Sequence, residues 1–227
     1  MANPIETLRK LKGRSLNEIR VRGEQAISVR TEQIGLSGKL PGNEEFNSLI
    51  DKSRLDEENI TPETLRAAFY KQSQTSFFQS FADKEKTLDA FRRNFGGIVT
   101  ASILDKAERI TESRFDLLGY QNLDFGGEHI DWHYEPIARK RVALKHWKQF
   151  DELSTEETGD KKIIWELNRH QYFFTLGQAY WLTGDERYAE TFARHLDEWI
   201  MQNPPGMGIN WVSSLEVAFR AISWIWA

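Results

Sequence analysis

The chain has 227 residues, of which 40% are hydrophobic and 28% are charged, a balance that excludes disordered and fibrous proteins. Its formal net charge of −4 argues against a general nucleic-acid-binding protein, because such proteins usually carry a basic face. No apolar run approaches the roughly 20 residues that span a bilayer. We therefore expect neither nucleic acid nor a membrane as a partner.

Cysteine is absent, which excludes disulfides, thiolate metal sites and a cysteine nucleophile. His129 and His133 with Glu128 and Asp131 are not expected to form a zinc site, because helical ligand spacing is implausible beside the glycines at 126–127. Phosphate-loop, dinucleotide and nucleophile-elbow motifs are missing from the sequence. We expect no metal and no cofactor. The start lacks the apolar segment of a secretory signal, so the chain as written is expected in the cytoplasm.

The first half of the chain predicts a series of helices. Ser15 and Glu18 form a capping box, and Thr61 followed by Pro62 is typical of a helix start. The glycines at 96–97 are expected to stop a helix. The predicted helices run from Ser15 to about Ile34, from Thr61 onward, from Asp83 to Phe95 and from Ile98 to about Glu112, with a connection at 35–60.

The helical period fails between residues 113 and 159, which we predict to be irregular with short extended pieces. Helices return in the second half of the chain. Gly184 is a typical helix stop and Asp185 a typical cap, so two long helices joined there predict an antiparallel pair. Ser213 and Glu216 form another capping box. The predicted helices run from Asp160 to Thr183, from Asp185 to about Asn203 and from Leu215 onward.

All eight tryptophans lie in the second half of the chain. Tryptophan suits both cores and sugar-stacking surfaces, so we expect most of them in the core and the rest as candidates for a carbohydrate groove. Trp224 and Trp226 come just before the last residue, and no helix cap follows them. This ending indicates a polypeptide that was cut within a helix.

Three blocks of the second half resemble signatures of the N-terminal region of the heparinase II/III family of polysaccharide lyases. The first reads Lys-Lys-Ile-Ile-Trp-Glu-Leu-Asn-Arg-His-Gln at 161–171, and the second reads Tyr-Trp-Leu-Thr-Gly-Asp-Glu-Arg-Tyr-Ala at 180–189. The third extends over 199–220 and contains Asn210, Trp211 and Ser-Ser-Leu-Glu-Val-Ala-Phe-Arg. The order and spacing of the blocks match together.

The resemblance implies a fold class that is all-α, with a partial, incomplete α/α toroid of antiparallel helix pairs. Residues 1–112 would be a helical leader and residues 113–227 the start of the toroid, cut before completion. The missing toroid helices and the β-sandwich of the parent chain would be partners of this part. Relatives of this family are often periplasmic.

The resemblance also implies cleavage of a uronic-acid polysaccharide, such as heparan sulfate or alginate, by β-elimination. The acidic polysaccharide would be the substrate partner. The family's Asn-His-Leu motif, catalytic tyrosine and further histidine would lie after residue 227. We therefore assign no catalytic residue and expect the chain alone to be inactive.

Five residues are candidates for substrate binding: Asn168, Arg169, His170, Asn210 and Trp211. A planar guanidinium grips carboxylates and sulfates, and tryptophan stacks on sugar rings. The alternatives are structural. Glu166, Asn168 and Arg169 would then tie neighbouring helices together, Asn210 would cap its turn, and Trp211 would pack beneath it.

Glu216 and Arg220 are four residues apart and predict an intrahelical ion pair. Two other functions remain open at this stage. A toroidal glycoside hydrolase needs two opposed carboxylates, for which Asp124, Asp131 and Glu166 are conceivable. A non-catalytic carbohydrate-binding module needs none.

Overall fold

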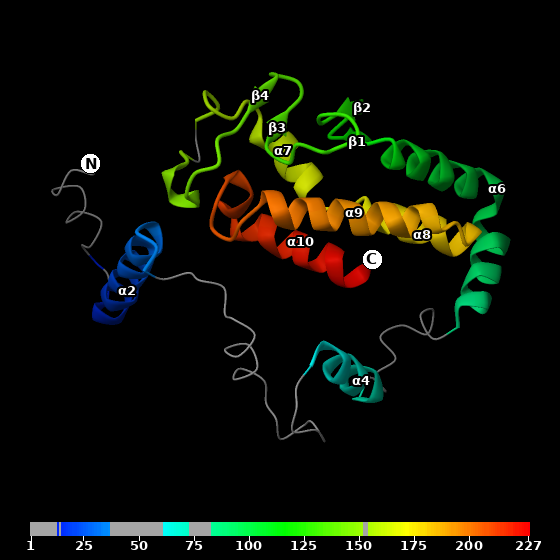
Figure 1. Cartoon of the computed structure of the whole chain (residues 1–227), viewed down its shortest axis with the longest axis horizontal. Helices are drawn as coiled ribbons and strands as arrows, with labels where there is room; N and C mark the ends of the chain where they lie inside the picture. The colour runs from blue at the N-terminus through cyan, green and yellow to red at the C-terminus, as the bar shows by residue number, and fades with distance from the viewer. Residues whose placement is uncertain (1–12, 14, 37–60, 73–82, 152–153) are drawn as a thin grey trace. The chain divides into compact units, whose positions relative to one another are not determined.

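The computed structural model describes residues 13, 15–36, 61–72, 83–151 and 154–227 (Figure 1). The chain divides into two compact units, residues 1–41 and 42–227. The first unit contains helix α2 (Leu16–Gln33), which begins where the capping box predicts: the Glu18 amide donates to the Ser15 hydroxyl at 3.2 Å. Helix α4 (Pro62–Gln72) also begins as predicted.

Helix α6 (Lys84–Thr111) consists of two helical halves that meet at a kink at Gly96, where the sequence predicts one helix to end and another to follow. Gly96 has φ 66° and ψ −173°, a conformation that glycine adopts without steric cost. Helical hydrogen bonding resumes directly after it, and the bend is visible in Figure 1. The predicted interruption at 96–97 is therefore confirmed, and Gly96 separates the two halves of α6.

Short strands occupy the segment that the sequence predicts as irregular. Strands β1 (Arg114–Leu117) and β2 (Tyr120–Asp124) form an antiparallel hairpin, and β3 (Tyr134–Glu135) pairs with β4 (Lys140–Arg141). A short 3-10 helix, η2 (Trp147–Gln149), follows. Each sheet within the described residues has two strands, so the chain is mostly helical as predicted.

Helix α7 (Lys161–Asn168) and helix α8 (Phe173–Thr183) replace the single long helix that the sequence predicts. His170 lies between them with φ 56°, a left-handed conformation that is uncommon for a residue with a Cβ atom. The amide of Phe173 donates to the carbonyl of His170 at 3.0 Å, so the chain turns before α8 begins. The prediction missed this break because the apolar pattern continues through it.

Helices α8 and α9 (Glu186–Gln202) form the predicted antiparallel pair. Gly184 adopts a left-handed conformation and Asp185 accepts from the Arg187 amide at 3.1 Å, so both predicted signals are confirmed. Helix η3 (Ile209–Trp211) leads to α10 (Ser214–Trp226), which contacts α8 (Figure 1). The Ser213 side chain makes no capping hydrogen bond, so the capping box predicted there does not form.

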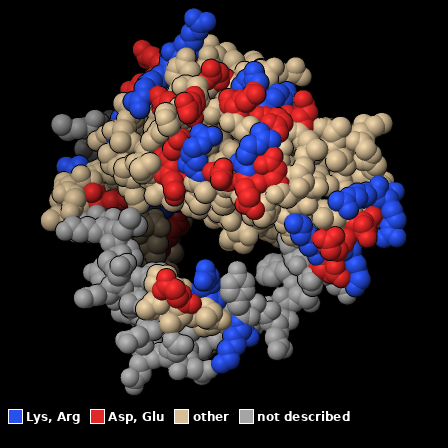
Figure 2. All heavy atoms as spheres, turned by 45° about the vertical axis from the view of Figure 1, so that its right-hand side comes forward, with Lys and Arg blue, Asp and Glu red and all other residues tan. Residues whose placement is uncertain are grey.

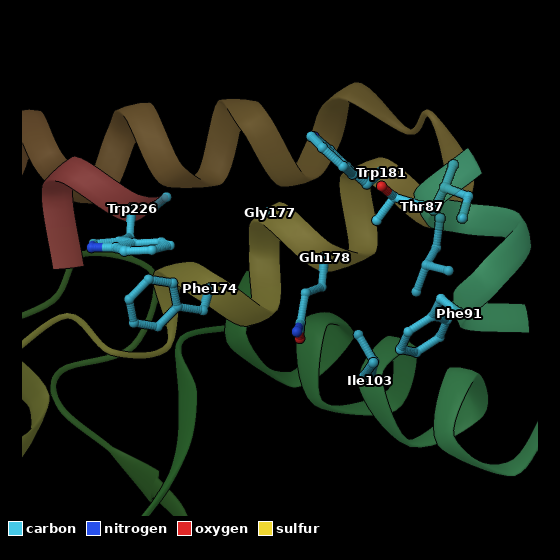
Figure 3. Close-up of a pocket in the computed structure, with 11 residues that line it drawn as sticks. Thr87, Phe91, Ile103, Phe174, Gly177, Gln178, Trp181 and Trp226 are labelled. Atoms are coloured by element: carbon cyan, nitrogen blue, oxygen red, sulfur yellow. The ribbon is translucent and has the colours of Figure 1, made fainter. Parts of the chain in front are cut away.

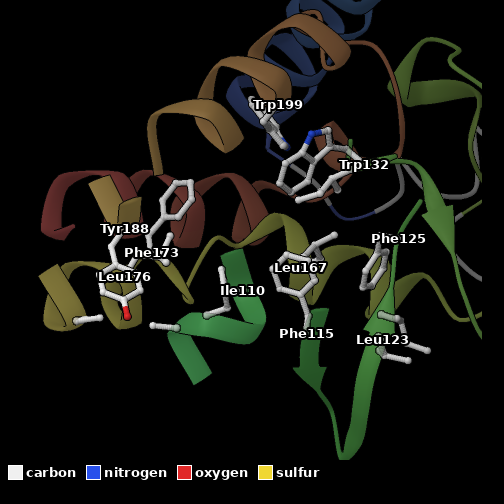
Figure 4. Packing of buried hydrophobic residues seen from close by; sticks show 14 residues of the cluster. Ile110, Phe115, Leu123, Phe125, Trp132, Leu167, Phe173, Leu176, Tyr188 and Trp199 are labelled. Carbon is white, nitrogen blue, oxygen red and sulfur yellow. The ribbon is translucent and has the colours of Figure 1, made fainter. Parts of the chain in front are cut away.

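The main hydrophobic core joins the second half of α6, the β1–β2 hairpin and helices α7, α8 and α9 (Figure 4). Of the eight tryptophans, Trp132 and Trp199 are buried within it, and the partly buried Trp211 and Trp224 pack against it. Trp226, in contrast, is 39% exposed near Ile222 and Ile225, which are 51% and 79% exposed. No helix in the described part of the chain is long and apolar enough to cross a membrane.

Gly208 offers a test of the packing around η3. Its φ is 97°, and an added Cβ atom would lie 2.7 Å from Cε1 of His133, a buried side chain. Gly127 has a similar φ of 83° but open space around it. Both Gly→Ala changes place a Cβ atom at positive φ, which costs about 1–3 kcal/mol, and the overpacked site at Gly208 adds about 1–3 kcal/mol. Urea unfolding should therefore show a larger loss of stability for Gly208→Ala than for Gly127→Ala. Equal losses would mean that the His133 contact is not restrictive.

Candidate functional site

The break between α7 and α8 is the centre of a buried polar network to which the predicted site residues belong. We call this network the polar hub. Hydrogen bonds from the hub reach α9, α10, η3 and the loop that carries Trp132. Its members are Glu166, Asn168, Arg169, His170, Asn210, Glu216 and Arg220.

Asn168 uses both ends of its side-chain amide. Its Nδ2 donates to the carbonyls of Trp132 at 3.1 Å and Ile164 at 2.8 Å. Its Oδ1 accepts from the indole Nε1 of Trp199 at 2.7 Å. Because Asn168 is 1% exposed and fully engaged, it joins three segments of the chain and has no solvent-facing group.

Arg169 is held by two carboxylates. Its Nε and Nη2 donate to Glu216 at 2.7 and 2.9 Å, a bidentate pair, and Nη1 donates to Glu166 at 2.6 Å. The hydrogen bonds that Arg169 donates to Glu216 raise the pKa of Arg169. The Arg169 side chain is 24% exposed, but each of its guanidinium nitrogens already meets a carboxylate. An incoming anion would have to displace one of these partners.

Arg220 donates to backbone carbonyls instead of forming the predicted ion pair with Glu216. Its Nε meets the carbonyl of Asn168 at 2.9 Å and its Nη2 that of Asn210 at 3.0 Å. The guanidinium lies 4.3 Å from the ring centre of Trp199, a cation–π contact. Burial lowers the pKa of Arg220 to about 10, so the side chain stays charged at neutral pH. The prediction failed because Glu216 has a better partner in Arg169.

Asn210 and Trp211 lie beside the same network. The Asn210 amide donates to Asn203 Oδ1 at 2.8 Å and to the carbonyl of Trp132 at 3.3 Å. Trp211 is half-buried, with its ring centre 5.9 Å from that of Trp199. The structure thus brings all five predicted residues together, and only Arg169 and Trp211 retain partial exposure.

Two buried histidines extend the hub into the core. Nδ1 of His170 accepts from the indole of Trp224 at 2.7 Å, and His195 meets the hydroxyl of Tyr172 at 3.1 Å. Burial holds the pKa of His170 well below its usual range, and it lowers the pKa of His195 to about 3. Both rings are therefore neutral at neutral pH, and both are enclosed by protein.

The acidic and histidine side chains near residue 130 do not converge. His129 pairs with Glu198 at 3.0 Å, whereas Asp131 pairs with Arg141 at 2.6 Å. Asp124 accepts from the amides at 126–127, away from either pair. Among the described residues, no three His, Asp or Glu side chains lie close enough to hold a metal ion.

Two of the cavities in the described part of the chain are formed largely by residues that do not belong to the hub. One of about 360 Å³ is lined mainly by apolar side chains from α6, α8 and α10, including Phe91, Phe174, Trp181 and Trp226 (Figure 3). The other, of about 290 Å³, lies between α6, β1 and the start of α8 and has mixed polarity. Basic and acidic side chains are interspersed over the face drawn in Figure 2, with no extended region of one sign. Sequence reasoning missed the second cavity because its residues come from distant segments without a shared motif.

These features define a mostly helical chain whose antiparallel helices are joined by a buried network of charged and amide groups. The chain matches the family described as "Heparinase II/III N-terminus" over residues 46–225 and therefore belongs to the heparinase II/III family. This match confirms the resemblance that the sequence blocks indicated.

Two relatives are heparin-sulfate lyases. The one from Bacteroides stercoris is 31% identical over 97 residues, which are 43% of this chain and 11% of that protein. The one from Pedobacter heparinus is 24% identical over 140 residues, which are 62% of this chain and 17% of that protein. The matched part thus spans less than a fifth of either relative. No solved structure matches the chain.

Replacement of Arg220 tests the hub. The Arg220→Met variant leaves the carbonyls of Asn168 and Asn210 without a donor, so the free energy of unfolding should fall by about 2–4 kcal/mol. Arg92→Met is the matched control, since Arg92 is exposed and its ion pair with Asp89 spans 3.8 Å. This control should change stability by less than about 0.5 kcal/mol. If chemical denaturation shows the same change in unfolding free energy for both variants, Arg220 does not stabilise the fold through the hub.

The neutral histidines predict a loss of stability in acid. The folded-state pKa of His195 lies near 3, whereas the ordinary value is 6.5. The contribution of His195 to folding stability is therefore fully present above about pH 6.5 and is lost as the pH falls toward 3. At pH 5 such a histidine lowers the free energy of unfolding by about 2 kcal/mol, because it is protonated in the unfolded state but stays neutral in the folded state. His170 shifts in the same direction.

The measurement is the free energy of unfolding at pH 7 and pH 5 for the unaltered chain and for His195→Asn. The variant should start less stable but lose about 2 kcal/mol less over this interval. An identical pH slope in both proteins would show that His195 titrates normally when the chain is folded.

Proposed function

We propose that this chain forms the N-terminal helical part of a polysaccharide lyase that cleaves a uronic-acid-containing polysaccharide by β-elimination. The observation that carries the proposal is the 31% identity with a heparin-sulfate lyase over 97 residues. The family match over residues 46–225 supports it. A heparan sulfate-like polymer is the first substrate to test, and alginate is the second.

β-Elimination makes specific demands on a protein. A base removes the proton from C5 of the uronate, and an acid protonates the leaving oxygen on C4. A further group must neutralise the carboxylate, because negative charge develops on it during proton removal. A site for this reaction therefore needs three groups that reach one sugar.

The hub contributes the framework for such a site rather than the reacting groups. His170 and His195 are buried, and their lowered pKa values make them weak bases. The guanidinium of Arg169 is occupied by Glu166 and Glu216. We propose that the hub fixes α7, α9 and α10 against one another, and that the acid, the base and the carboxylate-neutralising group lie outside this chain.

Arg169 and Trp211 are the predicted binding residues that keep exposed atoms, so they remain our candidates for contact with the polysaccharide. Asn168, His170 and Asn210 would act indirectly by holding these two in place. The alternative of a glycoside hydrolase is less well supported, because Asp124, Asp131 and Glu166 belong to separate local networks.

The chain alone should not cleave uronate polymers. Incubation with heparan sulfate and with alginate should give no ultraviolet absorbance from unsaturated uronates, while a heparin-sulfate lyase run in parallel on heparan sulfate gives a clear signal. Absorbance from the chain itself would contradict the proposal. The base would then be sought by replacing His129, His133 and His170 one at a time with alanine.

A further inference from the structure

The cavity of mixed polarity lies between the second half of α6, strand β1 and the start of α8, and we call it the α6–α8 cleft. Its volume of about 290 Å³ is near the lower end of the range for small-ligand pockets, roughly 300–1,000 Å³. Basic, amide and hydroxyl groups surround a partly apolar wall. The lining residues that carry the argument are Lys106, Arg109, Phe115, Gln171, Tyr172 and Thr175.

Several hydrogen-bonding groups of this cleft lack a partner within the described part of the chain. Nε of Arg109 is buried and has no acceptor, although Nη2 of the same side chain pairs with Asp116 at 2.8 Å and with Asp105 at 3.3 Å. Lys106 is exposed and forms no ion pair with a described residue. A buried N–H without an acceptor is unfavourable, and the Arg109 side chain lines the cleft, so a ligand that turns this side chain toward the opening supplies the acceptor that Nε lacks.

The acidic groups that line the cleft are already engaged. Oδ1 of Asp116 accepts from the Asn122 amide at 2.9 Å, and Oδ2 accepts from Arg109. Oε2 of Glu166 accepts from Arg169 at 2.6 Å. Arg114, the third basic residue of the lining, pairs with Glu112. Three basic and two acidic side chains line the cleft, and Lys106 is the basic one without a carboxylate partner among the described residues. The charge left for a ligand is therefore positive, which favours an anion.

The rest of the lining suits a polyhydroxylated ring. Phe115 and Tyr172 stack edge to face with their ring centres 4.9 Å apart, and the half-buried Tyr172 forms part of the wall. The side chains of Gln171 and Thr175 also line the cleft. Aromatic walls bind the apolar faces of sugar rings, and amides and hydroxyls bind their hydroxyl groups.

We propose that the α6–α8 cleft binds one acidic sugar unit of a polysaccharide. Its carboxylate or sulfate lies at Lys106 beside the Arg109 side chain, its ring lies against Tyr172, and its hydroxyl groups meet Gln171 and Thr175. The choice of an acidic polysaccharide rests on the proposed function, whereas the position of the subsite rests on the cleft. The lining of the subsite does not include the predicted residues Arg169 and Trp211, although Glu166, a partner of Arg169, belongs to it.

Calorimetric titration of the whole chain with two tetrasaccharides tests the ligand class. One is a heparan sulfate tetrasaccharide, and the other is maltotetraose, which is neutral and of equal length. We expect binding of the acidic tetrasaccharide only. An unsulfated glucuronate-containing tetrasaccharide keeps this affinity if the anion is a carboxylate and loses it if the anion is a sulfate. Equal affinity for maltotetraose would overturn the anionic assignment.

Paired variants test the position. Lys106→Ala and Gln171→Ala should each weaken binding of the acidic tetrasaccharide, Lys106→Ala by about tenfold because a charge-assisted hydrogen bond is lost. Lys86→Ala on α6 and Gln178→Ala on α8 are the controls, since both side chains are exposed and lie outside the cleft. Unchanged affinity in the cleft variants, or equal losses in the controls, would overturn the assignment.

The outcome is separable from that of the proposed function. Loss of the cleft assignment leaves the lyase relation and its cleavage assay unaffected. If the chain itself cleaves the polymer and the cleft binds as expected, the proposal that the reacting groups lie outside this chain is wrong, but the subsite assignment stands.

Discussion

The side-chain amide of Asn168 is the contact on which the arrangement of the second half of the chain depends. It satisfies the Trp132 carbonyl, the Ile164 carbonyl and the Trp199 indole at once. The backbone carbonyl of the same residue accepts from Arg220. An aliphatic side chain of the same size would fill the space but leave these groups without partners in a region closed to water. The cost of such unpaired groups makes the relative position of α7, α9 and the Trp132 loop specific.

The hub also shows how a charged group is accommodated in a core rich in tryptophan. Arg220 is buried, but two carbonyls accept from its guanidinium, and the face of Trp199 lies 4.3 Å away. Arg169 donates two hydrogen bonds to the carboxylate of Glu216, and Glu216 is therefore paired although Arg220 does not bind it. Each ion is compensated by groups from another segment, which is why the network joins segments instead of stabilising single helices.

Sequence reasoning succeeded where the cause of structure is local. The caps at Ser15 and Asp185 and the left-handed Gly184 act within one turn of backbone, and the structure contains them. It failed at His170, because the partner that holds this left-handed residue is Trp224, 54 positions away. The five predicted site residues do meet in space, but their partners, and the cleft between α6 and α8, depend on pairings over distances that no local pattern records.

The bend at Gly96 has a consequence for how the chain tolerates changes in length. In a continuous helix, one inserted residue rotates everything that follows by about 100°, so it turns core-facing side chains toward solvent. The backbone at Gly96 is not helical, so the second half of α6 does not continue the turn of the first half. Which of its side chains face the core is set by its own packing on α8 and β1. An insertion or deletion before the bend thus changes the facing of residues such as Leu88, which is 6% exposed, but leaves Ala107 and Ile110 in their places in the core.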